Sequence, residues 1–374
     1  MIELDTVLIK VASRCNINCD YCYVYNMGDT GWRDMPGQIS HKTIQVVADA
    51  LGELSHAQNR RFAVVLHGGE PLLLGPAKLK HLILQLRSAL PDDCSIGLQT
   101  NGLLITEDIL DICSDTRTTM SVSLDGPRHI HDQHRLGHQG QGTYDRVLQG
   151  LDLLRRHVDS SFIFSGLLAV IDPESDPEEI YDFFKQLDAP GVDFLYMDGN
   201  HSRLPRGKAS LQSTEYGGWL ARLLDIYLFD PKPLRIRFLD DLIKVILGGS
   251  GMKDGVGLTD FGVLIIDTDG SITKNDTLKS SFNGADRFTP SWSVHTHQLS
   301  EILNSTEFAD YHASQRPSSI VCRDCPELKI CGGGMTLHRW RDDNGYDNPS
   351  VYCADQKLLI EHIWEQLARI QTWS

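Results

Sequence analysis

Strand-length apolar runs alternate with helical patterns between Thr6 and about Met197, and this alternation limits the fold more than any other feature of the chain. The six runs are Val7–Val11, Phe62–Leu66, Ser95–Gln99, Met120–Leu124, Phe162–Val170 and Val192–Met197. Strands that alternate with helices in this way form βαβ units and a parallel sheet. Six units are too few for an eightfold barrel. We therefore predict an α/β fold with a partial (β/α)6 barrel.

The pattern changes after about residue 232. A helix at Leu239–Leu247 leads into a Gly-rich stretch and then into a hairpin, whose turn is Asp269-Gly270, a common turn dipeptide. The remainder is rich in turns up to a C-terminal helix near Gln356–Ile370. We predict two domains, the barrel at 1–235 and a second domain at 236–374.

The charge balance and the N-terminus exclude several classes of protein. Against 35 basic residues stand 50 acidic ones, so the formal net charge is −15. This excess argues against an electrostatic grip on nucleic acid or on an anionic membrane. No signal peptide is visible, and no window reaches the ~18 apolar residues of a membrane span. We expect a cytoplasmic protein whose partners are neither nucleic acid nor membrane.

The nine cysteines fall into two clusters and two isolated positions. An odd number without a signal peptide does not indicate a disulfide framework, whereas clustered thiols inside a cell usually indicate metal binding or catalysis. The isolated Cys94 and Cys113 have apolar neighbours, and we predict that both are buried in the core.

The first cluster, Cys15-x3-Cys19-x2-Cys22, supplies three thiolates within eight residues. Three ligands leave one iron of a four-iron cubane open, whereas structural zinc takes four ligands. With Tyr21 before its last cysteine, the string resembles the signature of radical S-adenosylmethionine (SAM) enzymes. In that family SAM chelates the open iron and is cleaved to methionine and a 5′-deoxyadenosyl radical. The resemblance implies SAM and a [4Fe–4S] cluster as cofactors, with Tyr21 beside them.

Other short motifs follow the predicted strands and extend this resemblance. His67-Gly68-Gly69-Glu70-Pro71 is similar to the family's second motif, in which backbone groups of Gly68 and Gly69, together with Glu70, would hold the SAM ammonium. By similarity, later strands would supply the remaining contacts: Thr100 and Asn101 at the ribose, Ser123 and Arg135 at the methionine carboxylate, and Leu168 at the adenine. Without the resemblance, Asn101-Gly102 would be a turn, Arg135 a solvated charge and Leu168 a core residue.

The second cluster has four thiols, at Cys322, Cys325, Cys331 and Cys353. Four ligands close a site, and either zinc or a fully ligated four-iron cluster fits that chemistry. The spacing resembles SPASM, the auxiliary-cluster extension of radical SAM enzymes that modify peptides and proteins. Full SPASM domains hold two auxiliary clusters, but Asn275 and Met335 stand where two ligands of the other one would be. The resemblance therefore implies two [4Fe–4S] clusters, one for SAM and one auxiliary.

Particular phrases resemble the FxsB-type SPASM maturases of ribosomally made peptides, including the cyclophane-forming group. These phrases are Val11–Cys19, His134-Arg135, Gly140–Val147, Thr268–Ile272 and Asp276–Lys279. The resemblance implies a precursor peptide with a leader as partner, and a flavodoxin- or ferredoxin-type electron donor. The expected reaction joins an aromatic ring carbon to the β-carbon of a nearby residue. Because Cys15 comes so early, we expect no separate peptide-recognition domain before the barrel.

Asp276 is the candidate catalytic base, because related maturases carry an Asp just after the position of Asn275. A turn-stabilising Asp beside a hairpin is the alternative. Other SPASM-type reactions stay open, namely thioether formation, epimerisation and formylglycine formation in sulfatases. Sulfatase maturases resemble the full three-cluster pattern, so Asn275 and Met335 count against that reaction. A non-catalytic iron–sulfur sensor or scaffold is a further class, although a scaffold would not require the SAM motifs.

Overall fold

The computed structural model describes residues 2–371, and in it the chain divides into two compact units. The first unit comprises residues up to 124, 131–166 and 261–312, and the second comprises 125–130, 167–260 and 313–374. These units interleave along the chain, so they differ from the continuous domains expected at 1–235 and 236–374. The predicted division at residues 235/236, which places the two cysteine clusters in different domains, stays a prediction.

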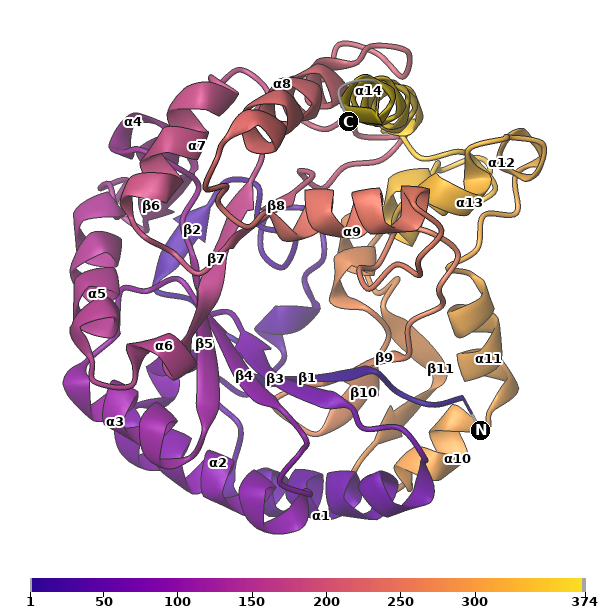
Figure 1. The fold of residues 1–374 in the computed structure, drawn as a ribbon. Coiled ribbons are helices and arrows are strands. Elements are labelled where there is room, and N and C mark those ends of the chain that lie inside the picture. The colour runs from indigo at the N-terminus through magenta and orange to yellow at the C-terminus, as the bar shows by residue number, and fades with distance from the viewer. Residues whose placement is uncertain (1, 372–374) are drawn as a thin grey trace. The chain divides into compact units, whose positions relative to one another are not determined.

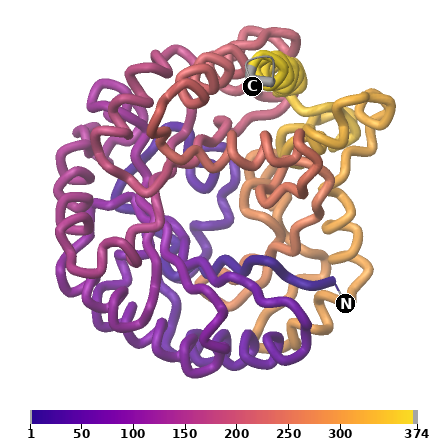
Figure 2. The backbone as a smooth tube through the Cα atoms, in the orientation of Figure 1, coloured from indigo at the N-terminus to yellow at the C-terminus, as the bar shows by residue number. Residues whose placement is uncertain are grey.

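The first unit is built on a sheet with the strand order β11-β10-β9-β1-β3-β4-β5 (Figure 1). Its parallel strands are β1 (Thr6–Ala12), β3 (Ala63–Gly68), β4 (Ile96–Thr100), β5 (Thr118–Ser123) and β9 (Val263–Ile266). The antiparallel strands β10 (Ser271–Thr273) and β11 (Arg287–Ser293) extend it past β9. In Figure 2 the indigo N-terminal strand runs beside the orange β9 segment, so strands more than 250 residues apart in the sequence pair in one sheet.

Helices of the first unit follow the strands as predicted, and side-chain caps fix where two of them begin. Ser40 accepts a hydrogen bond from Thr43 N at 3.0 Å at the start of one, and Thr106 caps another. The helices are α1 (His41–Ala57), α2 (Pro76–Ala89), α3 (Glu107–Asp115), α5 (Tyr144–Arg156), α6 (Ser160–Ile163), α10 (Leu299–Leu303) and α11 (Thr306–Ala313). Short 3-10 turns lie at η1 (Gly31–Arg33), η2 (Pro71–Leu74) and η3 (Asp276–Ser280).

The second unit contains the end of β7 (Phe164–Val170), which pairs in parallel with β8 (Val192–Leu195). The long helix α14 (Cys353–Gln371) packs against α8 (Glu215–Phe229), and α8 packs against α7 (Pro177–Gln186). The remaining elements are α9 (Arg237–Ile246), α12 (Ile320–Arg323), α13 (Leu328–Cys331) and η4 (Thr336–Arg339). Helix α4 (Arg128–His134) passes from one unit to the other.

The predicted class, α/β with a parallel sheet, is confirmed, and every predicted strand is present with small shifts of its ends. One boundary is wrong, because Phe162 and Ile163 belong to α6, where both amides donate to the Asp159 carbonyl. A continuous apolar run does not distinguish a helical turn from a strand. Cys94 and Cys113 are 1% and 0% exposed, which confirms that both lie in the core. Among the described helices, none is both long and apolar enough to span a bilayer.

Candidate functional site

The three N-terminal cysteines lie on one compact segment of the first unit. Cys15 comes shortly after β1, and Cys19 ends the short strand β2 (Ile17–Cys19). The amide of Cys22 donates to the Cys19 carbonyl at 3.1 Å, which turns the chain back on itself. Strand β2 pairs antiparallel with β6 (Arg135–Gly137), and the pairing sets Cys19 opposite Arg135. This small ribbon was absent from the sequence prediction because its strands are only three residues long.

Arg135 therefore lies at the cysteine segment, while its predicted contact with the methionine carboxylate of SAM stays a prediction. Its Nη1 lies 3.9 Å from Cys19 Sγ, and its guanidinium carbon lies 5.7 Å from the centre of the Tyr21 ring. Its side chain is only 8% exposed. A buried guanidinium beside the Cys19 thiol fits a site for anionic ligands, which include iron–sulfur clusters and carboxylates.

Two glycines let the end of β3 approach the segment that carries Cys15. Gly68 has φ +137, and a Cβ there would lie 2.2 Å from the Ala12 carbonyl oxygen. At Gly69 a Cβ would lie 2.2 Å from the Arg14 carbonyl oxygen and 2.0 Å from the Tyr25 hydroxyl. Because larger residues would collide with this backbone, the glycine pair is required for the close packing of β3 against the cysteine segment.

Glu70 connects the ends of two neighbouring strands. Its carboxylate accepts hydrogen bonds from the Thr100 hydroxyl at 2.7 Å, the Asn101 amide at 2.8 Å and the Leu72 amide at 3.0 Å. Burial raises its pKa to about 7, although the Asn101 amide and the Thr100 hydroxyl oppose that rise. These three bonds give Glu70 a structural role at the strand ends, and its predicted contact with the SAM ammonium stays a prediction.

The other predicted SAM residues lie around this junction, with one exception. Asn101 Nδ2 lies 3.7 Å from Cys15 Sγ and donates to Asn16 Oδ1 at 2.7 Å. Ser123 ends β5, and its hydroxyl accepts from Gln99 Nε2 at 2.9 Å. Leu168 is half-buried on β7 within the second unit. The structure thus groups the polar candidates, while the roles assigned to them and to Leu168 stay predictions.

The candidate base Asp276 lies in a buried group of charges in the first unit. It is 2% exposed, and its Oδ1 lies 2.7 Å from the ammonium of Lys10 on β1. Lys10 also lies 3.4 Å from Asp267, and Lys279 lies 4.0 Å from Asp276. Burial alone would raise the pKa of Asp276, but Lys10 and then Lys279 outweigh it and hold the pKa below its usual value. The carboxylate is therefore ionised and able to accept a proton.

Lys10 and His67 are members of this group that the motif analysis did not assign. They lie side by side in the β1–β3 register, at Lys10↔His67. His67 Nδ1 is buried without a hydrogen-bond partner, and burial lowers the pKa of the ring, which Asp276 partly offsets. A lysine within the otherwise apolar run of β1 was the available signal, because an isolated charge in a buried strand needs a partner.

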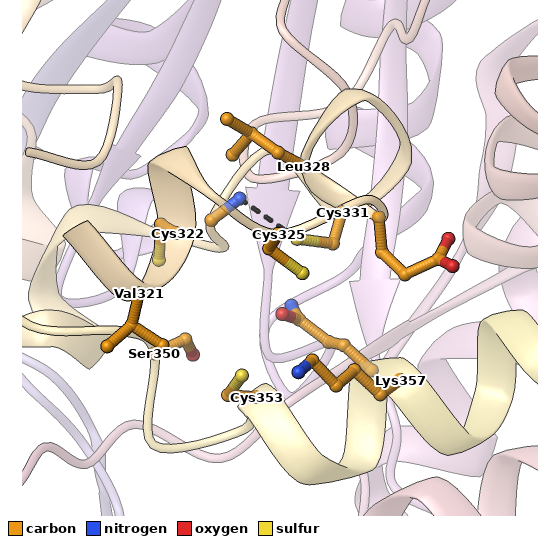
Figure 3. A pocket seen from close by; sticks show the side chains of 11 residues that line it. Val321, Cys322, Cys325, Leu328, Cys331, Ser350, Cys353 and Lys357 are labelled. Carbon is orange, nitrogen blue, oxygen red and sulfur yellow. Dashed lines mark hydrogen bonds between the residues drawn. The ribbon is translucent and has the colours of Figure 1, made fainter. Parts of the chain in front are cut away.

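The four C-terminal cysteines belong to the second unit and line one cavity of about 350 Å³, including space open to solvent. Figure 3 shows their sulfurs facing this space from three elements: α12, α13 with the turn before it, and the first residue of α14. Cys331 Sγ accepts a hydrogen bond from Gly333 N at 3.3 Å. Among the described residues, no three His, Cys, Asp or Glu side chains form the compact set that holds a single metal ion. The four thiols and this roomy cavity fit a four-iron cluster.

Of the residues at the two missing ligand positions, Asn275 has a structural role instead. The Asn275 side chain accepts hydrogen bonds from the amide and the hydroxyl of Thr277, at 3.1 and 2.9 Å, and so caps η3. Met335 precedes η4 as its N-cap residue. Asn275 also fixes the start of the turn that carries Asp276. The residue that replaces a SPASM ligand therefore positions the candidate base.

Comparison with known proteins then decides the family. The model of the Radical SAM superfamily matches residues 9–187, which include the three-cysteine segment and the glycine pair. Over these residues the chain matches the radical SAM superfamily. It is a radical SAM enzyme, and its cofactors are SAM and [4Fe–4S] clusters, which are characteristic of that superfamily.

Relatives of this radical SAM enzyme match along its full length. It is 25% identical to the cysteine-type anaerobic sulfatase-maturating enzyme of Clostridium novyi (strain NT), over 96% of this chain and 95% of that one. It is 26% identical to the serine-type anaerobic sulfatase-maturating enzyme of Bacteroides thetaiotaomicron, over 96% of this chain and 89% of that one. The radical SAM enzyme described here is therefore related to the anaerobic sulfatase-maturating enzymes.

Solved structures share its fold. Native anSMEcpe with bound AdoMet superposes with a TM-score of 0.82 at 21% identity and covers 98% of both chains. Streptococcus suis SuiB bound to precursor peptide SuiA gives a TM-score of 0.64 at 15% identity, over 93% of this chain and 76% of that one. Likeness at these identities establishes the α/β radical SAM fold.

Proposed function

We propose that this radical SAM enzyme oxidises the β-carbon of one side chain in a peptide segment, and that the product is formylglycine. Full-length similarity to both cysteine-type and serine-type sulfatase maturases supports this reaction. The observation that carries the proposal is the buried, ionised Asp276 held 2.7 Å from Lys10. Removal of two hydrogens from a thiol or an alcohol requires a base, and this carboxylate is kept ready to accept the proton.

The chain's own residues divide the work. When bound at the three-cysteine site, SAM and its cluster supply the group that takes a hydrogen atom from the substrate's β-carbon. Asp276 accepts the proton from the substrate's thiol or hydroxyl, and Lys10 keeps that carboxylate charged before the transfer. The electron that remains must pass to a one-electron carrier. With a cysteine substrate, water then replaces the sulfur and the sulfur leaves as hydrogen sulfide.

A second candidate is the crosslink between an aromatic ring and a nearby β-carbon. The observation that favours it is the pair Asn275 and Met335, which depart from the full three-cluster pattern of the sulfatase maturases. Both reactions begin with loss of a β-hydrogen and end with loss of a proton, so both use the same base. The substrate would then be a ribosomal precursor peptide with a leader.

One experiment separates the two candidates. The reconstituted enzyme is incubated anaerobically with SAM, a reductant and either a sulfatase-derived peptide or a precursor peptide. Formylglycine is an aldehyde, so its peptide reacts with an aminooxy probe, whereas a crosslinked peptide is lighter by two hydrogens and does not react. Release of 5′-deoxyadenosine without any change in peptide mass would contradict both candidates.

Iron analysis tests the cofactor part of the proposal. Two four-iron clusters predict about eight irons per chain. About four irons together with one zinc would remove the auxiliary cluster, and about twelve irons would mean that the departures at Asn275 and Met335 are compensated by other ligands. The variant Cys353→Ser serves as the control, because it should lose about four irons and keep the three-cysteine site.

A further inference from the structure

A half-buried tyrosine, Tyr196, lies just after β8 in the second unit, within a group of aromatic rings, and its hydroxyl oxygen is buried. Its ring centre is 4.3 Å from that of Tyr352, 5.8 Å from Phe238 and 6.0 Å from Tyr216. These contacts fix the position of the ring from several sides. The direction in which its hydroxyl points is therefore set by packing rather than chosen by a freely moving side chain.

The Tyr196 hydroxyl differs from those of its neighbours in having no acceptor. Among the described residues it is buried with no hydrogen-bond partner. The Tyr352 hydroxyl donates to the Met197 carbonyl, and the Tyr216 hydroxyl donates to the Arg206 carbonyl at 2.6 Å. A buried hydroxyl left without a partner destabilises the folded chain. Such a group in a well-packed core indicates an acceptor that is not part of the polypeptide.

The cavity around Tyr196 leads to the four-cysteine site. Tyr196 and Cys331 line the same cavity, of about 250 Å³, together with Gln356. Cys331 and Gln356 also line the cavity formed by the four cysteines. Tyr196 therefore shares a cavity with Cys331, one of the four candidate cluster ligands. Cluster sulfides and cysteine sulfurs accept hydrogen bonds.

We propose that the Tyr196 hydroxyl donates a hydrogen bond to a sulfur of the auxiliary iron–sulfur cluster beside Cys331 and raises the reduction potential of that cluster. The reduced cluster carries one more negative charge than the oxidised one, so a donor to its sulfurs stabilises the reduced state more. Burial holds the pKa of Tyr196 well above its ordinary value, so the hydroxyl stays protonated. The inference rests on the auxiliary cluster of the proposed function and names a residue that tunes it.

The test measures the reduction potential of the auxiliary cluster alone. All variants are made in a Cys15→Ala, Cys19→Ala, Cys22→Ala background, so that only the second cluster contributes to an anaerobic redox titration followed by electron paramagnetic resonance. In Tyr196→Phe we expect about a tenfold loss of electron affinity, which is about 59 mV for one electron. The matched control is Tyr352→Phe, which removes a hydroxyl from the same aromatic group but one that is bonded to Met197. It should leave the potential unchanged.

A second measurement determines the stability of the iron-free protein. In the iron-free chain the Tyr196 hydroxyl has no acceptor, so Tyr196→Phe should be as stable as wild type or more stable in a denaturant titration. Tyr352→Phe should be about fivefold less favourable in its folding equilibrium constant in the same assay, because it loses the hydrogen bond to Met197. Loss of stability in iron-free Tyr196→Phe would overturn the proposal, since it would assign the hydroxyl a protein acceptor such as His338, whose Nε2 is also unpartnered.

The outcomes separate this inference from the proposed function. An unchanged potential in Tyr196→Phe, or an equal shift in Tyr352→Phe, overturns the hydrogen bond while peptide oxidation stands. No paramagnetic signal from the second site removes both the auxiliary cluster and the hydrogen bond, whereas SAM cleavage at the first site is unaffected. A potential that shifts as expected, in an enzyme that leaves every peptide unchanged, supports the hydrogen bond and contradicts the proposed function.

Discussion

The two cysteine sites are assembled in opposite ways. At the three-cysteine site, eight consecutive residues carry every thiol, and the surrounding strand ends approach because Gly68 and Gly69 have no side chain. At the four-cysteine site, three thiols come from residues 322–331 and the fourth comes from Cys353, at the start of α14. A local segment can leave one iron open to a ligand, whereas a helix recruited from farther along the chain can close the coordination sphere.

Both units hold buried ion pairs, such as Lys10–Asp276 in the first and Lys208–Asp355 in the second, but they differ in one further buried cation. In the first unit, Lys10 and Lys279 lie among the carboxylates of Asp267, Asp276 and Asp286. In the second unit, the buried Arg339 guanidinium donates to neutral oxygens, the carbonyls of Ser314 and Gln315 and the Thr336 hydroxyl. The first arrangement prepares a carboxylate to take a proton, and the second leaves positive charge near the thiols. The comparison therefore predicts proton chemistry in the first unit and electron storage in the second.

The largest expected effect separates the two cysteine sites. Cys19→Ser should lower 5′-deoxyadenosine formation by roughly a hundredfold or more, because it removes a ligand of the cluster that binds SAM. Cys353→Ser should leave that formation within about threefold of wild type, since the local site does not need α14. Product analysis by liquid chromatography measures both. An equal loss in the two variants would show that the sites do not act separately.

Asp276→Asn tests proton transfer in the first unit. Peptide product should fall by about 10²–10⁴, because an amide cannot accept the proton, while 5′-deoxyadenosine still forms. Asp267→Asn is the matched control, since Asp267 also lies beside Lys10, at 3.4 Å, yet is not the proposed base. A parallel loss of 5′-deoxyadenosine in Asp276→Asn would assign the residue to SAM binding instead.

Lys10→Gln examines the same carboxylate through pH. Without the ammonium, burial dominates and the pKa of Asp276 rises. The base is then protonated at a higher pH, so the acid limb of the rate profile should move upward, and Lys10→Arg should restore it. A uniform decrease in rate at every pH would indicate that Lys10 only supports the fold.

Two buried titratable groups predict opposite pH slopes in the two units. The folded-state pKa of Glu70, about 7, exceeds its unfolded value, so its contribution to unfolding free energy falls by about 2 kcal/mol between pH 5 and 7. Burial lowers the pKa of His338 to about 3, so its contribution rises by about 2 kcal/mol between pH 5 and 6.5. Urea titrations of Glu70→Gln and His338→Gln against wild type should show these opposite differences. The same sign in both variants would refute the assignment.

Asn275→Ala concerns the ligand position that this chain has lost. The Asn275 side chain caps η3 by accepting from Thr277, so its removal should cost about 1 kcal/mol of unfolding free energy. Iron content should not change. Loss of iron together with stability would make Asn275 a ligand after all.

Lys357 gives the smallest expected effect. It lies one helical turn after Cys353 and lines the four-cysteine cavity, with its ammonium directed toward that space (Figure 3). Its side chain is exposed, so solvent screens its charge. Lys357→Gln should lower the auxiliary potential by less than Tyr196→Phe does, and 1 M salt should abolish the difference. A larger shift than that of Tyr196→Phe would place charge, rather than hydrogen bonding, in control of the potential.

Residue patterns predicted the strands, the α/β class and the radical SAM family, because each depends on local spacing. Cys15, Cys19 and Cys22 are close in sequence and are therefore close in space. The role of Lys10 was not predicted, because its partner Asp276 is distant in the sequence. The pairing of β1 with β9 brings the two residues together. The unpartnered Tyr196 hydroxyl was equally hidden, because a tyrosine in an apolar run looks like core.

The sequence by itself determined the chemistry that this protein can hold, namely seven clustered thiols and the SAM motifs, because covalent neighbours and their spacing fix which ligands are available. Only the tertiary structure decided how that chemistry is controlled. It placed an ammonium beside Asp276, three hydrogen bonds on Glu70, and Tyr196, whose hydroxyl has no partner among the described residues, in one cavity with Cys331. These are effects of burial, and burial depends on which distant segments pack together.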